Sequence, residues 1–191
     1  MNVRCLPILS LIAIFVCVNA YGQDGRPGDM ERYRAGSTEA LKKLEFLVGE
    51  WKGTGWALTP TGKQTSQITE VFRYKLGGQI AVVEGLGMAK DEKTGAERAT
   101  HQAFGVFSYD HASGKIRFRF YKAETGEEGE VFIEPSGKSI TWGFDVKESG
   151  SKIKFVQQIS PEGKWIETGD FSRDGGKTWM RFMEMELTRV Q

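Results

Sequence analysis

Residues 64–89, QTSQITEVFRYKLGGQIAVVEGLGMA, decide the fold of this chain. Two runs that are rich in β-branched and aromatic residues flank Gly77-Gly78, and a two-residue glycine turn suits the twist of a β-hairpin. Polar and apolar residues alternate along both runs, as in antiparallel strands that bury one face. The stretch therefore predicts a hairpin in which Glu70 lies opposite Gly85 and beside Glu84.

The same pattern of short runs and turn clusters continues to the end of the chain at intervals of about 8–12 residues. The predicted strands are residues 51–58, 64–76, 79–89, 101–109, 116–123, 130–134, 139–146, 152–159, 165–171 and 178–190. Before them, Ser37 is placed to cap a short helix with Leu41, Leu44, Leu47 and Val48 as its apolar stripe. Because consecutive strands expose two edges unless the sheet closes, we predict an all-β fold. It is a closed antiparallel up-and-down β-barrel of about ten strands with a short N-terminal helix.

The charge and cysteine content exclude several classes of protein. The 191 residues carry 26 basic and 25 acidic side chains, a formal net charge of +1. Such a balanced charge does not indicate the basic surface that is typical of nucleic-acid-binding proteins, so no nucleic-acid partner is predicted. Both cysteines, Cys5 and Cys17, lie in the N-terminal segment that we expect to be removed. The mature chain is therefore predicted to have no disulfide, no thiol nucleophile and no cysteine-based metal site.

The N-terminal segment has the features of a secretory signal peptide. Arg4 precedes an apolar run over residues 5–18, and Ala20 and Gly22 offer two cleavage positions. The run is shorter than the roughly 18 residues of a membrane span, which disfavours a retained anchor. The predicted divisions are a signal peptide over 1–22, a flexible leader over 23–36 and a barrel domain over 37–191. We therefore expect a periplasmic or secreted protein with no membrane span after cleavage.

Four polar residues fall on the predicted apolar face of the barrel: Glu70, Glu84, Gln157 and Arg181. Buried charges need partners, and Arg181 is available to answer one of the two glutamates. Either these residues lie in water, through a slip of register or a place at the barrel mouth, or they anchor a ligand inside an apolar pocket. The second interpretation gives a set of candidate ligand-binding residues: Glu70, Glu84, Arg181, Trp142, Phe118 and Phe120.

One motif carries a resemblance to a known family. The residues Leu44-x-x-Leu47-x-Gly49-x-Trp51-x-Gly53, followed by Gly77-Gly78 and by the run 165–190, resemble the domain-of-unknown-function 1579 family. The resemblance covers residues 41–190 and implies an exported, calycin-like or lipocalin-like barrel, similar to nitrobindins and fatty-acid-binding proteins. In calycins a tryptophan of the first strand packs under a basic side chain from the last strand. Trp51 and Arg189 match those positions, which implies a structural cation–π pair.

The resemblance does not extend to haem. Nitrobindins bind haem through a histidine near the last strand, but residues 177–186, KTWMRFMEME, contain no histidine. The two histidines, His101 and His111, stand beside a charged loop and in a turn, where we expect them in solvent. Methionines at strand spacing, such as Met183 and Met185, are usually core residues. Haem is therefore disfavoured, and no cofactor and no metal site are predicted.

The motif Ser172-x-Asp174-x-Gly176-x-Thr178-Trp179 fits the Asp-box found on sialidase blades, but it occurs once. A propeller repeats such a unit along the chain, so we interpret Asp174 and Trp179 as structural residues of one hairpin. The sequence contains no Gly-x-Ser-x-Gly elbow and no His-Glu-x-x-His. No catalytic residue is assigned.

The most direct functional hypothesis is an exported protein that binds a small, largely apolar molecule, or an accessory protein of the cell envelope. The alternative is an enzyme that uses the same cavity, with Glu70 or Glu84 as the acid–base group. A third, purely structural interpretation requires a filled interior. An apolar cavity open at one end would favour the binding protein.

Overall fold

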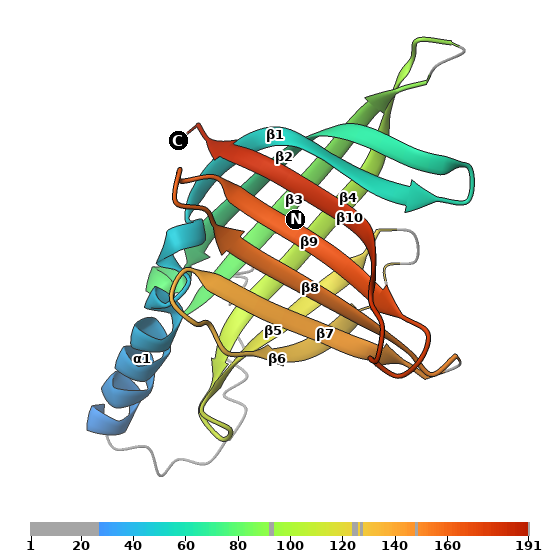
Figure 1. The fold of residues 1–191 in the computed structure, drawn as a ribbon. Helices are drawn as coiled ribbons and strands as arrows, with labels where there is room; N and C mark the ends of the chain where they lie inside the picture. The colour runs from blue at the N-terminus through green and yellow to red at the C-terminus, as the bar shows by residue number, and fades with distance from the viewer. Residues whose placement is uncertain (1–26, 92–93, 124–125, 127, 148, 191) are drawn as a thin grey trace, which may run out of the picture.

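The computed structural model describes residues 27–91, 94–123, 126, 128–147 and 149–190 (Figure 1). Over this part of the chain, ten strands follow one helix, α1 (Pro27–Lys42). The strands are β1 (Gly49–Thr59), β2 (Gly62–Lys75), β3 (Ile80–Lys90), β4 (Glu97–Asp110), β5 (Lys115–Lys122), β6 (Glu128–Ile133), β7 (Ser139–Val146), β8 (Ser151–Ile159), β9 (Trp165–Ser172) and β10 (Met180–Arg189). The predicted signal peptide and residues 23–26 lie outside the described residues.

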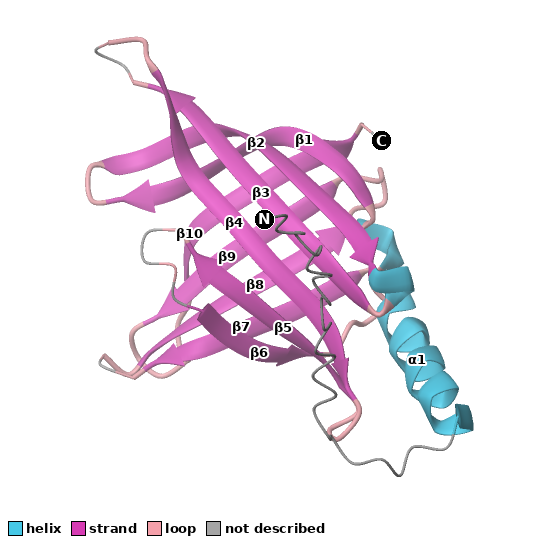
Figure 2. Ribbon diagram, turned by 180° about the vertical axis from the view of Figure 1, so that it is seen from behind, coloured by secondary structure: helices cyan, strands magenta, loops and turns pink. Residues whose placement is uncertain are grey.

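The strands form a single antiparallel sheet in the order β6-β5-β4-β3-β2-β1-β10-β9-β8-β7. Consecutive strands pair with each other from β1 to β6 and from β7 to β10, and β1 also pairs with β10, so the sheet curls into a barrel. β6 and β7 lie side by side (Figures 1 and 2), but the described residues of these two strands form no ladder with each other. The predicted all-β up-and-down barrel is confirmed, and it is nearly closed, with a seam between β6 and β7.

The β2–β3 hairpin keeps its predicted register. Glu70 lies opposite Gly85, and the last pair before the turn is Lys75 with Ile80. The turn is wider than the predicted two-residue loop, because Leu76–Gly78 forms a single 3-10 turn with Leu76 and Gly77 at positive φ. Compared with a two-residue loop, the turn takes one additional residue from each strand, so the pairing of the two strands is unchanged.

The prediction that Glu84 lies on the inner, apolar face of β3 is wrong. Residues directly opposite each other on paired strands point to the same side of a sheet, so Gly85 faces the interior together with Glu70, and Glu84 points outward. Glu84 is exposed, and Leu86 of the same face is 42% exposed. Val82 and Val83 are adjacent and equally apolar, so hydrophobicity alone did not indicate which of them faces the interior.

The N-terminal helix is longer and begins earlier than predicted. α1 starts at Pro27, a residue favoured in the first helical turn, so residues 27–36 of the predicted flexible leader are helical. The apolar stripe divides between the end of α1 and a 3-10 turn over Glu45–Leu47. Leu41, Leu44 and Leu47 are at most 1% exposed and pack into the core at one end of the barrel (Figures 1 and 2).

Ser37 lies where the helix meets the barrel rather than at a helix end, and His111, which is exposed as expected, contacts the helix at the same place. The Ser37 hydroxyl and His111 Nε2 are 3.0 Å apart, and the imidazole packs edge-on against Tyr33 of α1 and Tyr109 of β4. Gly36 leaves room for the ring, because a Cβ there would lie 3.3 Å from His111 Cε1. These contacts hold α1 against the turn that joins β4 to β5.

The expected contact of Trp51 with Arg189 is present at the same end of the barrel. The two residues are paired across β1 and β10, and the Arg189 guanidinium lies 4.4 Å from the Trp51 ring. Arg189 donates to the Phe46 carbonyl at 2.8 Å, and Trp51 Nε1 donates to the Leu47 carbonyl at 2.8 Å. One pair of side chains therefore connects the first strand, the last strand and the 3-10 turn.

Asp174 organises the turn between β9 and β10. One carboxylate oxygen accepts hydrogen bonds from the Ser172 hydroxyl and from the backbone N–H groups of Lys177 and Thr178. These bonds stabilise the ionised carboxylate and hold the pKa of Asp174 far below its usual range. Trp179 Nε1 donates to the Gly176 carbonyl at 3.1 Å. The motif therefore stabilises this one turn through local hydrogen bonds.

Within the described ranges, no helix has both the length and the hydrophobicity needed to cross a membrane.

Candidate functional site

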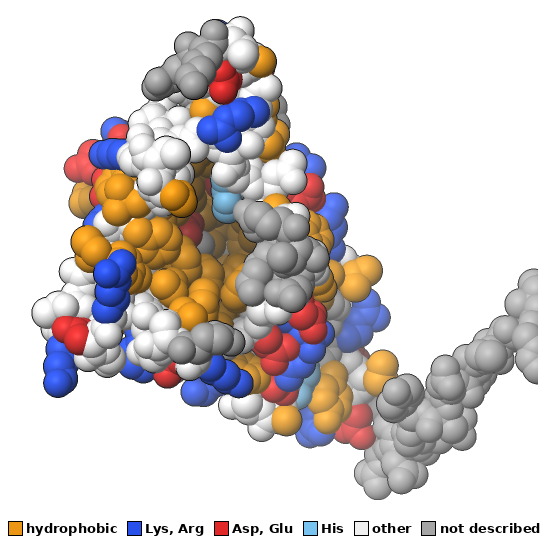
Figure 3. All heavy atoms as spheres, turned by 90° about the vertical axis from the view of Figure 1, so that its right-hand side faces the viewer, with side chains coloured by type: hydrophobic (Ala, Val, Ile, Leu, Met, Phe, Trp, Pro, Cys, Tyr) orange, Lys and Arg blue, Asp and Glu red, His pale blue; other side chains and the backbone are white. Residues whose placement is uncertain are grey.

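A cavity of about 370 Å³ occupies the barrel and opens at the end opposite α1 (Figure 3). Figure 3 shows this opening as a hollow lined mainly by hydrophobic side chains. The inward-facing positions of strands β1–β5 and β7–β10 contribute to its wall. The interior is therefore not completely filled.

Part of the cavity wall is a cluster of aromatic rings. Trp142 of β7 stacks on Phe155 with the ring centroids 4.3 Å apart, and it contacts Phe118 and Phe120 of β5 at 5.2 and 5.3 Å. Phe182 of β10 extends the wall through an edge-on contact with Phe155. Since Trp142 and Phe118 stand on opposite sides of the β6–β7 seam, these ring contacts also hold the barrel together where the ladder is missing.

Glu70 projects into the apolar interior. It is 4% exposed, and it forms no hydrogen bond or ion pair with a described residue. Gly85 across the ladder makes space for it, because a Cβ at Gly85 would lie 2.3 Å from Glu70 Oε1. Burial raises the pKa of Glu70 from 4.5 to about 8, and the nearby carboxylate of Glu167 adds to this effect. The group is largely protonated at neutral pH.

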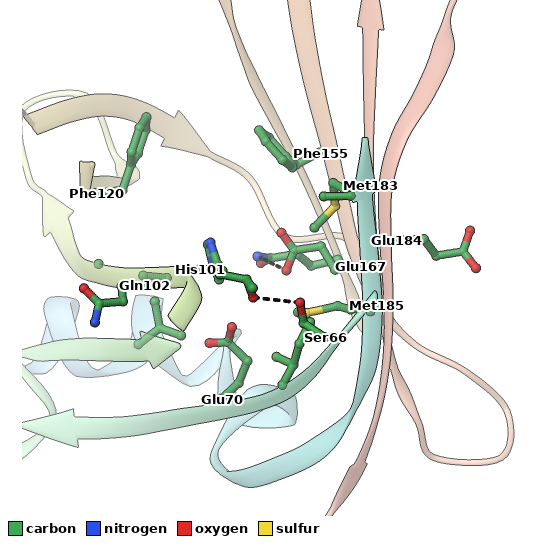
Figure 4. A pocket seen from close by; sticks show the side chains of 18 of the residues that line it. Ser66, Glu70, His101, Gln102, Phe120, Phe155, Glu167, Met183, Glu184 and Met185 are labelled. Atoms are coloured by element: carbon green, nitrogen blue, oxygen red, sulfur yellow. Dashed lines mark hydrogen bonds between the residues drawn. The ribbon is translucent and has the colours of Figure 1, made fainter. Parts of the chain in front are cut away.

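Glu167 is a second carboxyl group in the same cavity, contributed by β9. It is 9% exposed and accepts a hydrogen bond of 2.9 Å from Nε2 of Gln157, its partner on β8. Burial raises the pKa of Glu167 to about 7, and the hydrogen bond from Gln157 opposes the rise. In Figure 4 the side chains of Glu70 and Glu167 both point into the cavity, whereas Glu184 points away from it.

Four of the six predicted ligand-binding residues line the cavity: Glu70, Trp142, Phe118 and Phe120. Glu84 does not, because it lies on the outer face of β3. Arg181 does not either: its guanidinium bonds outward to Asp170 at 2.7 Å and to Glu184 at 2.9 Å. The predicted ion pair of Arg181 with a cavity glutamate is therefore wrong.

A β-bulge explains the position of Arg181. The register of β10 against β9 shifts between Arg181 and Met183, so alternation counted back from Met183 fails beyond that point. Phe182 lies in the bulge and lines the cavity. Nothing in the local composition marked this irregularity.

Sequence reasoning missed Glu167, although a signal was present. Trp165 is a large apolar residue at the start of a predicted strand, and it is 1% exposed. Counting by two from Trp165 places Glu167 and Gly169 on the inner face. The same count would have paired Glu167 with Gln157 across the short turn that precedes Trp165.

The side chains around the cavity differ sharply in charge from the outside of the barrel. The described lining residues include three glutamates and one histidine, His101, and no lysine or arginine. No group of three or more histidine, cysteine, aspartate or glutamate side chains in the described residues is arranged to hold a metal ion. The site is an aromatic pocket with carboxyl groups inside it.

The fold defines the chain as a nearly closed up-and-down barrel of calycin-like architecture. No protein-family model matches the sequence, and no curated protein matches it. Among solved structures, the chain is similar to Rv2717c from M. tuberculosis, with 15% identity and a TM-score of 0.56 over 80% of this chain and 98% of that one. It is also similar to EF1p2_mFAP2b bound to DFHBI, with 12% identity and a TM-score of 0.34 over 80% and 99% of the two chains. The likeness to Rv2717c supports the fold alone, and membership of the domain-of-unknown-function 1579 family stays a prediction.

Proposed function

We propose that this chain is an exported protein that binds a small, largely apolar molecule in the barrel cavity. The observation that carries the proposal is the cavity itself: about 370 Å³, walled by aromatic rings and open at one end. Ligand pockets commonly have volumes of roughly 300–1,000 Å³, with apolar walls and a few polar groups that fix the orientation of the ligand. The cavity has both features.

The residues of the cavity wall are more typical of a binding site than of a core that only fills the barrel. Side chains that serve only as core pack to high density and leave few voids larger than a water molecule. Here the small residues Ser66, Ala103 and Gly105 line the space together with large rings. An exported binding or accessory protein of the cell envelope fits the apolar N-terminal run in the sequence.

An enzyme that uses the same cavity is a second candidate, and the pKa values of the two buried carboxyl groups favour it. Groups whose pKa lies near the working pH suit general acid–base catalysis, and burial raises the pKa of Glu70 to about 8 and that of Glu167 to about 7. The acid–base pair is then Glu70 with Glu167, since Glu84 is outside. Recovery of a chemically changed ligand would distinguish an enzyme from a binding protein.

The test combines a fluorescent probe with recovery of the natural ligand. The neutral naphthalene dye prodan should bind the purified protein with a blue-shifted emission, and lipophilic extracts of protein from its native envelope should contain a molecule that displaces the dye. Ala103→Phe should reduce dye binding because residue 103 lines the cavity. Ala99→Phe is the matched control, since residue 99 is exposed on the same strand. Equal dye binding by both variants and the parent would refute the proposal.

A further inference from the structure

The charged side chains of the cavity are unbalanced. Of the charged residues among the described lining positions, Glu70 and Glu167 point inward, whereas Glu184 points outward to Arg181. Neither inward carboxyl group forms an ion pair with any described residue. A carboxylate buried without a cation is unfavourable, so this arrangement is stable in the empty barrel only with protons on the acids.

The carboxyl groups of Glu70 and Glu167 are the acidic groups that point into the cavity, whose wall also carries hydroxyl and amide side chains such as Ser66 and Gln102. The amide N–H₂ of Gln157 already donates to Glu167. The indole nitrogens of Trp142 and Trp165 have no described partner, but they are fully covered by neighbouring atoms. Once ionised, the two carboxyl groups offer only acceptor oxygens, so a ligand that replaces their protons must supply hydrogen-bond donors.

The aromatic wall adds a second attraction for positive charge. Aromatic rings attract a cation placed over their faces, most strongly when water is excluded. The rings of Trp142, Phe155 and Phe182 line the same cavity as the two carboxyl groups. A molecule with a positive end and an apolar body would match both parts of this surface.

We propose that the ligand is an organic amine whose protonated nitrogen pairs with the carboxyl groups of Glu70 and Glu167, while its apolar body packs against the rings around Trp142. This inference rests on the proposed function of the cavity as a small-molecule site, and it names the chemical class that the site selects. A carboxylic acid would instead bring a third acidic group to the same place.

Binding of an amine should release protons. Burial keeps the pKa of Glu70 at about 8 and that of Glu167 at about 7 in the empty cavity, and a neighbouring ammonium group lowers the pKa of a carboxyl. The titratable groups that face Glu70 are Glu167 from β9 and His101 from β4, which lines the cavity. Between pH 6 and pH 8 the affinity should therefore rise with pH, by up to about tenfold per pH unit for each proton released.

Three probes that share one apolar body test the inference by titration calorimetry: 3-phenylpropylamine, 3-phenylpropanol and 3-phenylpropionate. We expect the amine to bind at least about tenfold more tightly than the alcohol, as a charged hydrogen-bonded pair would give. Glu70→Gln should remove most of the difference in affinity between the amine and the alcohol. Glu84→Gln is the matched control on the same hairpin, with its side chain outside the barrel, and it should behave as the parent.

Proton release is measured on the parent protein, so the test does not depend on the folding of a variant. The heat of amine binding should differ between buffers of different ionisation enthalpy. Equal affinity for amine and alcohol, a preference for the propionate, or binding of prodan without any binding of the amine would overturn the inference and leave the cavity proposal standing. Failure of prodan and of all three probes would overturn both.

Discussion

Glu70 and Gly85 lie directly opposite each other on β2 and β3, and the Glu70 carboxyl group occupies the space that a side chain at position 85 would need. The cavity therefore holds a buried acid because its partner across the ladder has no Cβ. This pairing connects the backbone of one hairpin to the chemistry of the cavity.

Gly85→Ala tests this relationship. The new Cβ would lie 2.3 Å from Glu70 Oε1, so the carboxyl group must move, and we expect a loss of about 1–3 kcal/mol, as for other overpacked cores. In a Glu70→Ala background the same substitution should cost much less, because the obstructing group is gone. Urea melts of the four proteins measure the coupling, and equal costs in both backgrounds would contradict it.

The two buried acids make stability depend on pH near neutrality. Their pKa values are raised in the folded protein, to about 8 for Glu70 and about 7 for Glu167, from 4.5. The folded state thus binds more protons than the unfolded state between these values, and the stability contributed by the acids is complete below about pH 4.5. It falls as the pH rises and levels off above pH 8, and the total loss is on the order of a few kcal/mol.

Denaturant melts at pH 5, 6, 7 and 8 check this expectation. Glu70→Gln and Glu167→Gln should each flatten the fall in stability, since glutamine cannot lose a proton. Glu84→Gln should follow the parent curve, because its side chain is outside the barrel. Parallel curves of stability against pH for the parent and the Glu70 variant would show that folding does not raise the pKa of this carboxyl group.

Trp51 and Arg189 should be energetically coupled. Trp51 is 1% exposed, and Trp51→Ala should cost about 3–5 kcal/mol, as truncation of buried aromatic residues does. Arg189→Ala should cost less, since it removes the cation–π contact and one hydrogen bond to the Phe46 carbonyl. The double variant should cost less than the sum of the two single variants. Strict additivity in equilibrium unfolding would argue against the pair.

The β6–β7 seam should depend on Trp142. Trp142 belongs to β7, and its ring contacts Phe118 and Phe120 of β5, on the other side of the seam. Trp142→Ala should therefore reduce amide protection against hydrogen exchange most strongly in β6 and β7, and less in β1 and β2. Phe132→Ala is the control, because Phe132 is on β6 but is 45% exposed. Uniform loss of protection over all strands would contradict a special role of Trp142.

The sequence was informative wherever one physical rule acted alone. Turn residues between strongly alternating runs were enough to predict the barrel, and the glycine pair was enough to predict that Glu70 lies opposite Gly85. The same register implied that Glu84 points outward, but the apolar residues at Ile80, Val82 and Leu86 indicated the opposite face. The pairing geometry was the stronger constraint, since it applies to every residue of the ladder.

Other features depended on contacts between distant segments. Arg181 was placed inside because a bulge cannot be recognised from alternation. Residues 27–36 have no apolar periodicity, and Tyr33 in this stretch packs against His111, which is remote in sequence. Glu167 was overlooked because an acidic residue in a strand is usually at the surface. Its inward position follows only when Trp165, Glu167 and Gly169 are recognised as alternate residues on one face of the strand.

Under the proposed binding function, the helix at the closed end of the barrel determines which end of a molecule enters first. Leu41, Leu44 and Leu47 fill that end, and Trp51, whose strand partner is Glu70, lies directly beside them. A molecule that enters from the open end therefore presents its leading group to the carboxyl groups, while its trailing part remains near the solvent. Molecules with the same head and tails of different length would then be held in the same manner, so the barrel distinguishes the end of a molecule rather than its size.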